Sequence, residues 1–304
     1  MRRFDCVVIG GGPAGLTAGI YLGRARVNFV IFDEKGFGGL SVYSDRIENY
    51  PGFPDGLSGF ELAQLMKKQA EKFGAKIEIK KVHKIQKKAD FKVFAGEEVV
   101  EAKSIILAVG SNFKKLNIPG EKEFTGRGVS YCATCDGAFF NGKKVCVIGG
   151  GDGAFSEALF LTKFAEKVFI IHRRDEFRAS KILVERAKQN PKVEFVLSFV
   201  PVEIQGEDKV KQIILKSTKT NEKNFLSCDG VFIAVGESPN TEFLKGFVDM
   251  DERGFIITDE KLSTSQKGVF AAGDCRAKEF RQIITACGDG AVSAFSCQEY
   301  LEKV

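Results

Sequence analysis

The pattern of hydrophobic and polar positions repeats itself at two places along this chain. Residues 6–22 read CVVIGGGPAGLTAGIYL and residues 145–161 read VCVIGGGDGAFSEALFL, and the two segments align without a gap. In each copy, an apolar run of the kind found in buried strands ends in glycines. Apolar residues then recur at the spacing of an amphipathic helix. The pattern therefore predicts a strand, a glycine turn and a helix, twice over.

The two glycine turns carry the spacing of a dinucleotide-binding fingerprint. Their small residues are Gly10, Gly12 and Gly15 in the first copy, and Gly149, Gly151 and Ala154 in the second. The first glycine permits a tight turn, the second lets a pyrophosphate approach the backbone, and the third small residue lets helix and strand pack closely. The helix N-terminus then faces the anion. Two such turns predict two dinucleotide sites; the alternative is that both turns serve packing alone.

Charged residues after the next strand distinguish the two sites. In the first copy, a strand predicted over residues 28–32 ends at Asp33 and Glu34. A carboxylate there binds ribose hydroxyls and repels a 2′-phosphate. The residue aligned with Glu34 in the second copy is Arg173, within HRRDEFR at 172–178, and arginine binds phosphate through a planar fork of donors. The contrast predicts FAD at the first site and NADPH at the second, against the alternative of a solvated charge run.

A second repeat marks where the predicted domains join. Residues 106–110 (ILAVG) and 232–236 (FIAVG) are apolar strands that end alike, and a third variant, VFAAGD, stands at 269–274. The first two lead into segments with the composition of linkers, NIPG at 117–120 and ESPN at 237–240. We therefore expect the second dinucleotide unit to be inserted into the first.

The expected fold is α/β, with two Rossmann-like dinucleotide-binding domains of which the second is inserted into the first. The outer, FAD-binding domain is predicted to comprise residues 1–113 and 243–304, and the inserted, NADPH-binding domain residues 114–242. Two sequential domains would leave the last residues without a partner sheet.

Composition and charge narrow the function. With 304 residues, 44% of them hydrophobic and 28% charged, the chain has the composition of a soluble globular protein. Its apolar runs are shorter than the ~18 residues of a membrane helix, and the N-terminus leads straight into a strand, so we expect a cytoplasmic protein without a membrane partner. The net charge of +5 is spread over mixed lysines and glutamates, which argues against a dedicated nucleic-acid binder.

Two of the eight cysteines form a close pair, Cys132 and Cys135, followed by Asp136. Two cysteines three positions apart can form and break a small disulfide ring, and the carboxyl of Asp136 can move a proton to or from a departing thiolate. The other six cysteines are expected to be small core residues. The alternatives are an inert pair of core thiols and a zinc site, which would need further ligands in a chain with two histidines.

At this point the motifs carry a resemblance. Over essentially its full length, the chain resembles the low-molecular-weight thioredoxin reductases. The matching segments, in family order and spacing, are GGGPAG (10–15), IENYPGF (47–53), CATCDG (132–137), GGGDGA (149–154), HRRDEFRA (172–179), AVGESPNT (234–241), AAGDC (271–275) and RQIITACGDG (281–290).

The resemblance implies a route for electrons, from NADPH to FAD, then to the Cys132–Cys135 disulfide, then to oxidised thioredoxin or a thioredoxin-like protein. Cys132 would attack the partner disulfide, Cys135 would face the flavin, and Asp136 would be the acid/base. A homodimer is expected. Rotation of the inserted domain between two states is expected as well, with residues 119–120 and 238–239 as the hinge segments. The implied FAD contacts are Gly10, Gly12, Pro13, Ala14, Gly15, Asp33, Glu34, Gly39, Leu40, Asn49, Val82, Ala108, Gly110, Gly273, Asp274, Arg281, Gln282 and Ile283. The implied NADPH contacts are Gly149, Gly151, Asp152, Gly153, Ala154, His172, Arg173, Arg174, Arg178 and Gly236.

The chain departs from the family pattern at Leu40, where the family has a glutamine whose amide lies near the flavin, and more mildly at Gly153, where it commonly has serine. Leu40 keeps open a rival on the same scaffold, a disulfide reductase supplied by ferredoxin. Relatives of that kind lose the phosphate-binding arginines, which this chain keeps. A second alternative is a flavin electron carrier in which the cysteine pair is structural.

Overall fold

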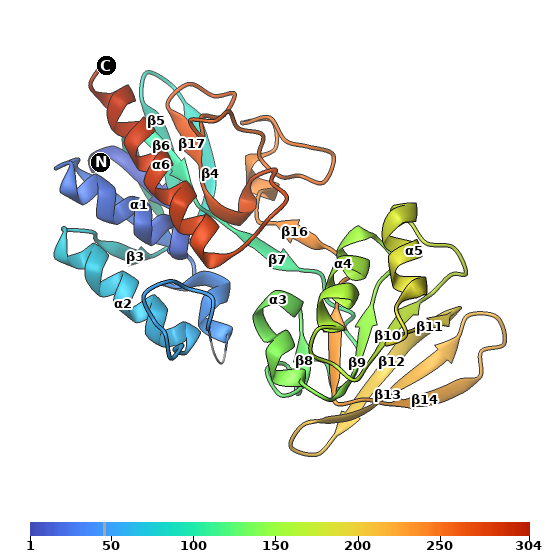
Figure 1. Ribbon diagram of the computed structural model, residues 1–304. Helices are drawn as coiled ribbons and strands as arrows, with labels where there is room; N and C mark the ends of the chain where they lie inside the picture. Colours follow the sequence, from blue (N-terminus) through green and yellow to red (C-terminus); the bar gives the residue numbers. More distant parts are fainter. Residues whose placement is uncertain (45–46) are drawn as a thin grey trace. The chain divides into compact units, whose positions relative to one another are not determined.

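The computed structural model describes residues 1–44 and 47–304, which fall into two compact units (Figure 1). Unit 1 joins Met1–Asn112 to Ser238–Val304, and unit 2 is Phe113–Glu237. In Figure 1 the blue N-terminal part and the red C-terminal part of the chain therefore belong to the same unit. The chain leaves unit 1 after residue 112 and returns after residue 237, where the sequence placed these transitions after 113 and 242.

The two connecting segments pair with each other as short strands. They are β7 (Ser111–Phe113) and β16 (Glu237–Pro239), which form a two-stranded sheet. Residues 119–120 lie elsewhere, because Pro119 O accepts a hydrogen bond from Ile204 N at 2.9 Å. A Cβ on Gly120 would collide with the carbonyl oxygen of Ile204. These residues are packed inside unit 2, so the prediction of a linker and hinge at 117–120 is wrong.

Unit 1 is built on a seven-stranded sheet in the order β3-β2-β1-β6-β5-β4, with β17 also paired to β6. Strand β6 pairs with three strands. Residues 98–102 pair antiparallel with β5, residues 105–107 pair parallel with β17, and residues 101–107 pair parallel with β1. Strands β1, β2 and β3 continue the parallel part. The strands are β1 (Arg3–Ile9), β2 (Phe29–Asp33), β3 (Ile77–Ile79), β4 (Val82–Lys87), β5 (Phe91–Ala95), β6 (Glu98–Leu107) and β17 (Val269–Ala271).

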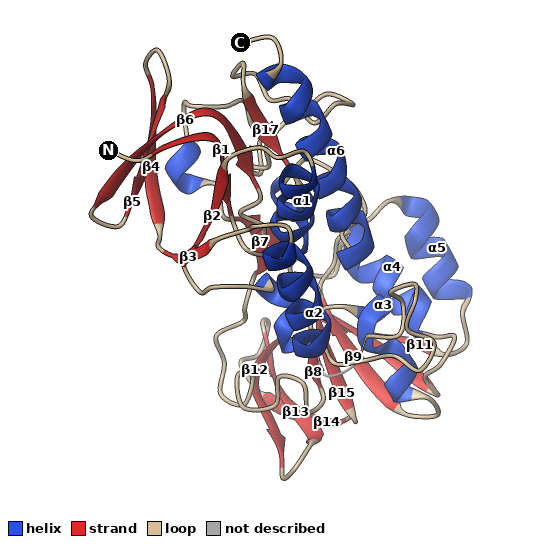
Figure 2. Cartoon of the chain, turned by 90° about the vertical axis from the view of Figure 1, so that its left-hand side faces the viewer, coloured by secondary structure: helices blue, strands red, loops and turns tan. Residues whose placement is uncertain are grey.

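Three helices pack on one side of the parallel strands of unit 1. Helices α1 and α6 run side by side, and α2 contacts α1 (Figure 2). Helix α2 opens with a capping box in which Ser58 and Glu61 each accept a hydrogen bond from the other's backbone amide. The helices are α1 (Pro13–Arg24), α2 (Gly59–Lys72) and α6 (Ile283–Leu301), with 3₁₀ turns η1 (Gly39–Tyr43), η3 (Glu242–Leu244) and η4 (Gly273–Cys275). None of the helices in the described part of the chain combines the length and the apolar character of a membrane-spanning segment.

The uninterrupted apolar run of β1 is explained by a core on each face of the sheet. Cys6 and Val8 pack with α1, α2 and α6, whereas Val7 and Ile9 pack with β4 and β5. Successive strand residues point to opposite faces, so a strand covered on both sides is apolar at every position.

Unit 2 repeats this plan. Five parallel strands follow the order β11-β10-β9-β15-β8, and β12, β13 and β14 form a separate antiparallel sheet. The strands are β8 (Val129–Ser130), β9 (Lys144–Ile148), β10 (Lys167–His172), β11 (Val193–Leu197), β12 (Phe199–Gly206), β13 (Val210–Ser217), β14 (Lys223–Ser227) and β15 (Gly230–Ile233). The helices are α3 (Ala133–Asp136), α4 (Asp152–Leu161) and α5 (Lys181–Gln189), with the 3₁₀ turn η2 (Gly137–Phe140).

The core of unit 2 follows the same alternation. Val145 and Val147 of β9 pack with α4, whereas Cys146 and Ile148 pack with residues of β12 and β13. The repeated sequence pattern thus forms the same strand–turn–helix in both units. The predicted fold class, α/β with two Rossmann-like parallel sheets, is confirmed.

Candidate active site and cofactor sites

A tight glycine turn joins β1 to α1 in unit 1. Gly10 has a φ of 114°, and a Cβ there would lie 2.1 Å from Ala108 O. Gly15 is equally confined, since its Cβ would lie 1.8 Å from Gly10 O. Helix α1 begins at Pro13, and its N-cap Gly12 offers no side-chain acceptor to the first amides. These amides lie at the positive end of the helix and suit a phosphate of a ligand.

The two carboxylates after β2 have different surroundings. Asp33 Oδ2 accepts a hydrogen bond from Gly11 N at 2.7 Å, and its Oδ1 accepts two amides of the following loop at 2.6 and 2.9 Å. Asp33 therefore holds the glycine turn and its own loop together. The side chain of Glu34 is exposed and pairs with Lys81 at 3.2 Å. Glu34 is the carboxylate that a ribose could reach.

Residues far apart in the sequence gather around this turn. A Cβ on Gly273, which opens η4 after β17, would lie 2.9 Å from the Cβ of Ala14 in α1. A Cβ on Gly39, at the start of η1, would lie 3.3 Å from the Cα of Gly12. Gly110, with a φ of 66°, follows the turn after β6. Gly39 and Gly273 thus lie against the turn and the first residues of α1.

The remaining predicted flavin contacts of unit 1 are more spread out. Asn49 Nδ2 donates to Gln282 Oε1 at 3.1 Å, which joins the segment around 47–53 to the N-cap of α6. Helix α6 begins at Ile283. Leu40, in η1, is 37% exposed. Val82 begins β4, and its buried side chain lies in the core opposite to that of α1.

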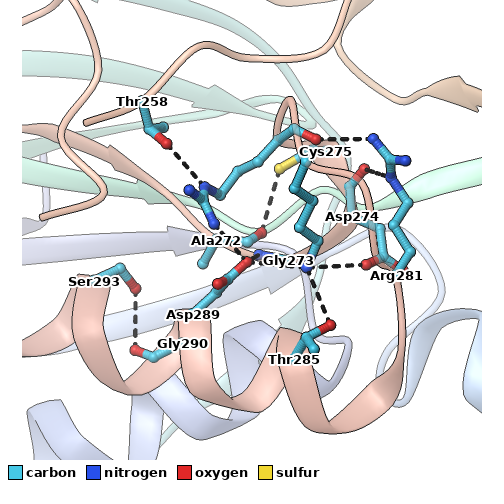
Figure 3. A network of polar contacts seen from close by, with 12 residues as sticks. Thr258, Ala272, Gly273, Asp274, Cys275, Arg281, Thr285, Asp289, Gly290 and Ser293 are labelled. Carbon is cyan, nitrogen blue, oxygen red and sulfur yellow. Dashed lines mark hydrogen bonds and ion pairs between the residues drawn. The ribbon is translucent and has the colours of Figure 1, made fainter. Parts of the chain in front are cut away.

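Asp274 has a buried carboxylate oxygen with unused acceptor capacity. No described residue donates a hydrogen bond to its Oδ1; Lys278 Nζ lies 3.4 Å away as an ion-pair partner, but in poor alignment. Burial raises the pKa of Asp274, and the charges of Lys278 and Arg281 oppose that rise. Arg281 Nε donates to the backbone oxygen of Asp274 at 3.3 Å (Figure 3). The Arg281 guanidinium also lies 4.1 Å from the ring centre of Phe255.

The sequence analysis missed three charged residues beside Asp274, namely Arg276, Lys278 and Asp289. Asp289, on α6, accepts a hydrogen bond from Gly273 N at 3.0 Å. A signal for it existed, because Asp289 lies inside the RQIITACGDG segment that carried part of the resemblance. Arg276 and Lys278 lie between two such segments and gave no signal of their own.

The second glycine turn joins β9 to α4 in unit 2. Gly149 is confined, since its Cβ would lie 2.5 Å from Ala234 O, but a Cβ on Gly151 or Gly153 would meet nothing within 4 Å. Gly151 is the N-cap of α4 and offers no side-chain acceptor. Asp152 Oδ1 accepts the amide that precedes α5, at 2.6 Å. The turn is therefore open on the side of the helix N-terminus, as a dinucleotide requires.

An arginine cluster follows β10, the next strand. Arg173, Arg174 and Arg178 are exposed, and their charges surround the half-buried His172. Burial lowers the pKa of His172, and the three guanidiniums lower it further, so the ring is neutral at neutral pH. Its Nε2 lies 3.1 Å from Glu176 O.

Asp175, one of the two acidic residues in this segment, is bound outside the arginine cluster. Asp175 accepts Ser198 Oγ at 2.6 Å and Lys219 Nζ at 2.5 Å. The arginines therefore keep a positive field that an anion can use. At the other end of the unit, Gly236 follows β15 with a φ of 108° and accepts Lys114 N at 2.9 Å.

Cys132 and Cys135 form a disulfide in the structure, with their Cα atoms 5.3 Å apart. Cys132 is the N-cap of α3, and Cys135 N donates to Cys132 Sγ at 3.2 Å. Both residues are half-buried, in unit 2. The other six cysteines are buried free thiols, as predicted.

A serine that the sequence analysis did not name connects the disulfide to its carboxylate. Ser130 Oγ donates to Asp136 Oδ2 at 2.6 Å and accepts Cys132 N at 3.1 Å. Ser130 ends β8 and is 5% exposed, so these bonds are formed in a largely dry place.

A second buried carboxyl lies in α4. No described residue donates a hydrogen bond to Glu157 Oε2. Burial, together with the negative charge of Glu237, raises the pKa of Glu157 to about 8. Glu157 is therefore mostly protonated at neutral pH.

Comparisons with known proteins agree with this geometry. The family model described as pyridine nucleotide-disulphide oxidoreductase matches residues 4–290. A thioredoxin reductase of Treponema pallidum (strain Nichols) is 45% identical over 302 residues, covering 99% of this chain and 98% of that protein. One of Bacillus subtilis (strain 168) is 43% identical over 305 residues, covering 100% and 96%.

A solved structure is similar in fold as well as in sequence. The crystal structure of thioredoxin reductase from Streptococcus pyogenes MGAS5005 matches with a TM-score of 0.95 and 44% identity, over 99% of both chains. The two dinucleotide-type turns and the disulfide beside a carboxylate agree with relatives that are similar over their full length. This chain belongs to the pyridine nucleotide-disulphide oxidoreductases and, among them, to the thioredoxin reductase family.

Proposed function

We propose that the protein is a thioredoxin-disulfide reductase that passes electrons from NADPH through FAD and the Cys132–Cys135 disulfide to oxidised thioredoxin. The observation that carries the proposal is the disulfide itself, half-buried, with Asp136 held beside it by Ser130. The same unit contains the open glycine turn and the arginine cluster. The named relatives are thioredoxin reductases over their whole length.

The residues of unit 1 fit a flavin dinucleotide. The N-terminus of α1 is free of a side-chain cap at Gly12, and no described residue donates a hydrogen bond to the buried Asp274 Oδ1. We assign the pyrophosphate to the turn at Gly10 and Gly12, a ribose to Glu34, and the ribityl chain to Asp274. Bound there, a flavin accepts a hydride from the nicotinamide and returns an electron pair to a disulfide.

The residues of unit 2 fit NADPH. The turn at Gly149 and Gly151 would hold the pyrophosphate. Arg173, Arg174 and Arg178 would bind the 2′-phosphate, which NADH lacks. The retained arginines favour NADPH over ferredoxin as the electron donor.

The chain's own residues account for the exchange with a partner disulfide. The Cys132 thiolate attacks one partner sulfur, forms a mixed disulfide and releases the other sulfur as a thiolate, which takes a proton from Asp136. Cys135 then attacks Cys132, which re-forms the internal disulfide and releases the second partner thiolate. The bond from Cys135 N to Cys132 Sγ supports this order, because an amide donor stabilises a thiolate at Cys132.

We also propose a homodimer in the cytoplasm. Large apolar side chains remain exposed along one face of α6, namely Ile284, Val292 and Phe295. A second copy of the chain would cover them. Six free thiols suit a reducing compartment. Sedimentation of the wild type and of Phe295→Glu tests the dimer, which the charged variant should dissociate; a monomeric wild type contradicts it.

The deciding experiment is anaerobic titration of the purified protein with NADPH, followed by oxidised thioredoxin. NADPH should bleach the flavin absorbance, and thioredoxin should restore it. A flavin that is reduced by ferredoxin but not by NADPH would favour the rival donor. Bleaching that thioredoxin does not reverse would favour a flavin electron carrier.

A further inference from the structure

Four charged side chains form a compact network at the end of β17 in unit 1 (Figure 3). They are Asp274, Arg276, Lys278 and Asp289, and their side chains are 31%, 14%, 13% and 16% exposed. The two acids and two bases lie where charges are poorly hydrated, so each needs a partner within the protein.

Asp289 fixes the backbone of the turn. Its Oδ2 accepts Gly273 N at 3.0 Å, Arg276 Nη1 at 2.9 Å and Lys278 Nζ at 3.1 Å. Because Asp289 lies on α6, these contacts tie the turn after β17 to that helix. Arg276 is held in its turn by Thr258 Oγ1, at 2.9 Å.

Lys278 forms ion pairs with both Asp274 and Asp289, whereas Arg276 forms one with Asp289. Its Nζ lies 3.4 Å from Asp274 Oδ1, 3.1 Å from Asp289 Oδ2 and 3.4 Å from Thr285 Oγ1. Without Lys278, Arg276 would still neutralise Asp289. Asp274 would then face Arg281, whose guanidinium donates to the backbone oxygens of Asp274 and Arg276.

The environment of Asp274 shows why that matters. Burial raises the pKa of its carboxyl, Asp289 raises it further, and Lys278 and Arg281 lower it. A carboxylate that loses its nearest cation in such a place takes up a proton more readily. A protonated Asp274 would offer an acidic hydrogen where the site needs an acceptor.

We propose that Lys278 is a positioning residue for the flavin site: by bridging Asp274 and Asp289 it keeps the Asp274 carboxylate ionised and in place to accept hydrogen bonds from the ribityl hydroxyls. The inference rests on the proposed function and adds to it a residue that acts through Asp274. It concerns the affinity and pH dependence of flavin binding.

The test uses full-length protein from which the flavin has been removed, and measures the Kd for added FAD between pH 5.5 and 8.5. The variants are Lys278→Met, Lys278→Gln, Asp274→Asn and the double variant Lys278→Met with Asp274→Asn. Lys245→Met is the matched control, because Lys245 is an exposed lysine whose ion pair is with Glu242.

We expect Lys278→Met to weaken FAD binding about tenfold at neutral pH, as for loss of a charge-assisted contact, and more at lower pH. The loss grows at lower pH because the pKa of Asp274 is higher in the variant. The Asp274 carboxylate of the variant is then protonated at a pH where that of the wild type is still charged. Lys278→Gln, which keeps a donor but no charge, should show the same pH-dependent loss. In the Asp274→Asn background, Lys278→Met should cost less than about twofold, since no carboxylate remains to be ionised.

An equal, pH-independent loss in both backgrounds would overturn the proposal, because Lys278 would then act through Asp289 and the fold alone. An unchanged Kd in both Lys278 variants would overturn it as well. The thermal midpoint of each flavin-free protein shows whether Lys278→Met folds; if it does not, Lys278→Gln decides. Failure of the proposed function would give a different result, because the wild type would then bind no FAD, or NADPH would not reduce the bound flavin.

Discussion

Ser130 Oγ donates a 2.6 Å hydrogen bond to Asp136 Oδ2, across the turn that contains the redox disulfide. The same oxygen accepts the amide of Cys132 at 3.1 Å. A single hydroxyl thus sets the position of the carboxyl relative to the backbone of Cys132, the proposed attacking cysteine. A carboxyl that protonates a departing thiolate depends on such placement.

Ser130→Ala should therefore slow thioredoxin reduction about tenfold while leaving flavin reduction by NADPH at its wild-type rate. Asp136→Asn should slow it further, because the proton itself is lost. Stopped-flow absorbance separates the two half-reactions. Ser227→Ala, at an exposed position of the same unit, is the control. A variant that also slows reduction by NADPH would show that Ser130 supports the fold of unit 2.

Arg173→Ala combined with Arg174→Ala should weaken NADPH binding about a hundredfold and NADH binding little. The reason is that two charge-assisted contacts to the 2′-phosphate are removed. Isothermal titration of both nucleotides measures the effect, with the exposed Arg186→Ala as the control. An equal loss for NADPH and NADH would show that the cluster does not recognise the 2′-phosphate.

Replacing the two cysteines should have different results. Cys135→Ser should trap thioredoxin in a mixed disulfide with Cys132, because no thiol remains to resolve it. The adduct appears as a band that disappears on adding reductant. Cys132→Ser should form no adduct. Trapping by Cys132→Ser instead would reverse the assigned roles, and full activity in both variants would exclude the redox function of the pair.

The buried Glu157 predicts a pH-dependent stability. Its pKa is raised to about 8 in the folded protein, chiefly by burial, so the folded state holds a proton that the unfolded state releases near pH 4.5. Stability should fall as the pH rises through that window. Glu157→Gln cannot ionise, so its free energy of unfolding should fall less than that of the wild type between pH 5.5 and 8.5. Urea unfolding should show a difference between the two falls of up to about 3 kcal/mol. Glu185→Gln, exposed on α5, is the control; equal pH slopes in wild type and Glu157→Gln would contradict the prediction.

The sequence by itself determined the elements whose signals are local. The positive φ at Gly10 and the apolar run of β1 depend on neighbouring residues, so the pattern predicted strand, turn and helix in both copies. The Cys132–Cys135 pair could be predicted for the same reason, because two cysteines three positions apart already lie within disulfide-bonding distance.

Only the tertiary structure decided which side chains remain available to a ligand. Asp33 and Glu34 are adjacent acids in the sequence, but the amide of Gly11 engages Asp33 and leaves Glu34 at the surface. Residues 119–120 read as a linker, yet they pack on β12. The proposed role of Lys278 depends on its ion pair with Asp289, which lies on another element, α6. Such contacts join residues that are far apart in the sequence, at separations that follow no helix or strand period. They form only when packing brings the elements together and removes water from between their charged side chains.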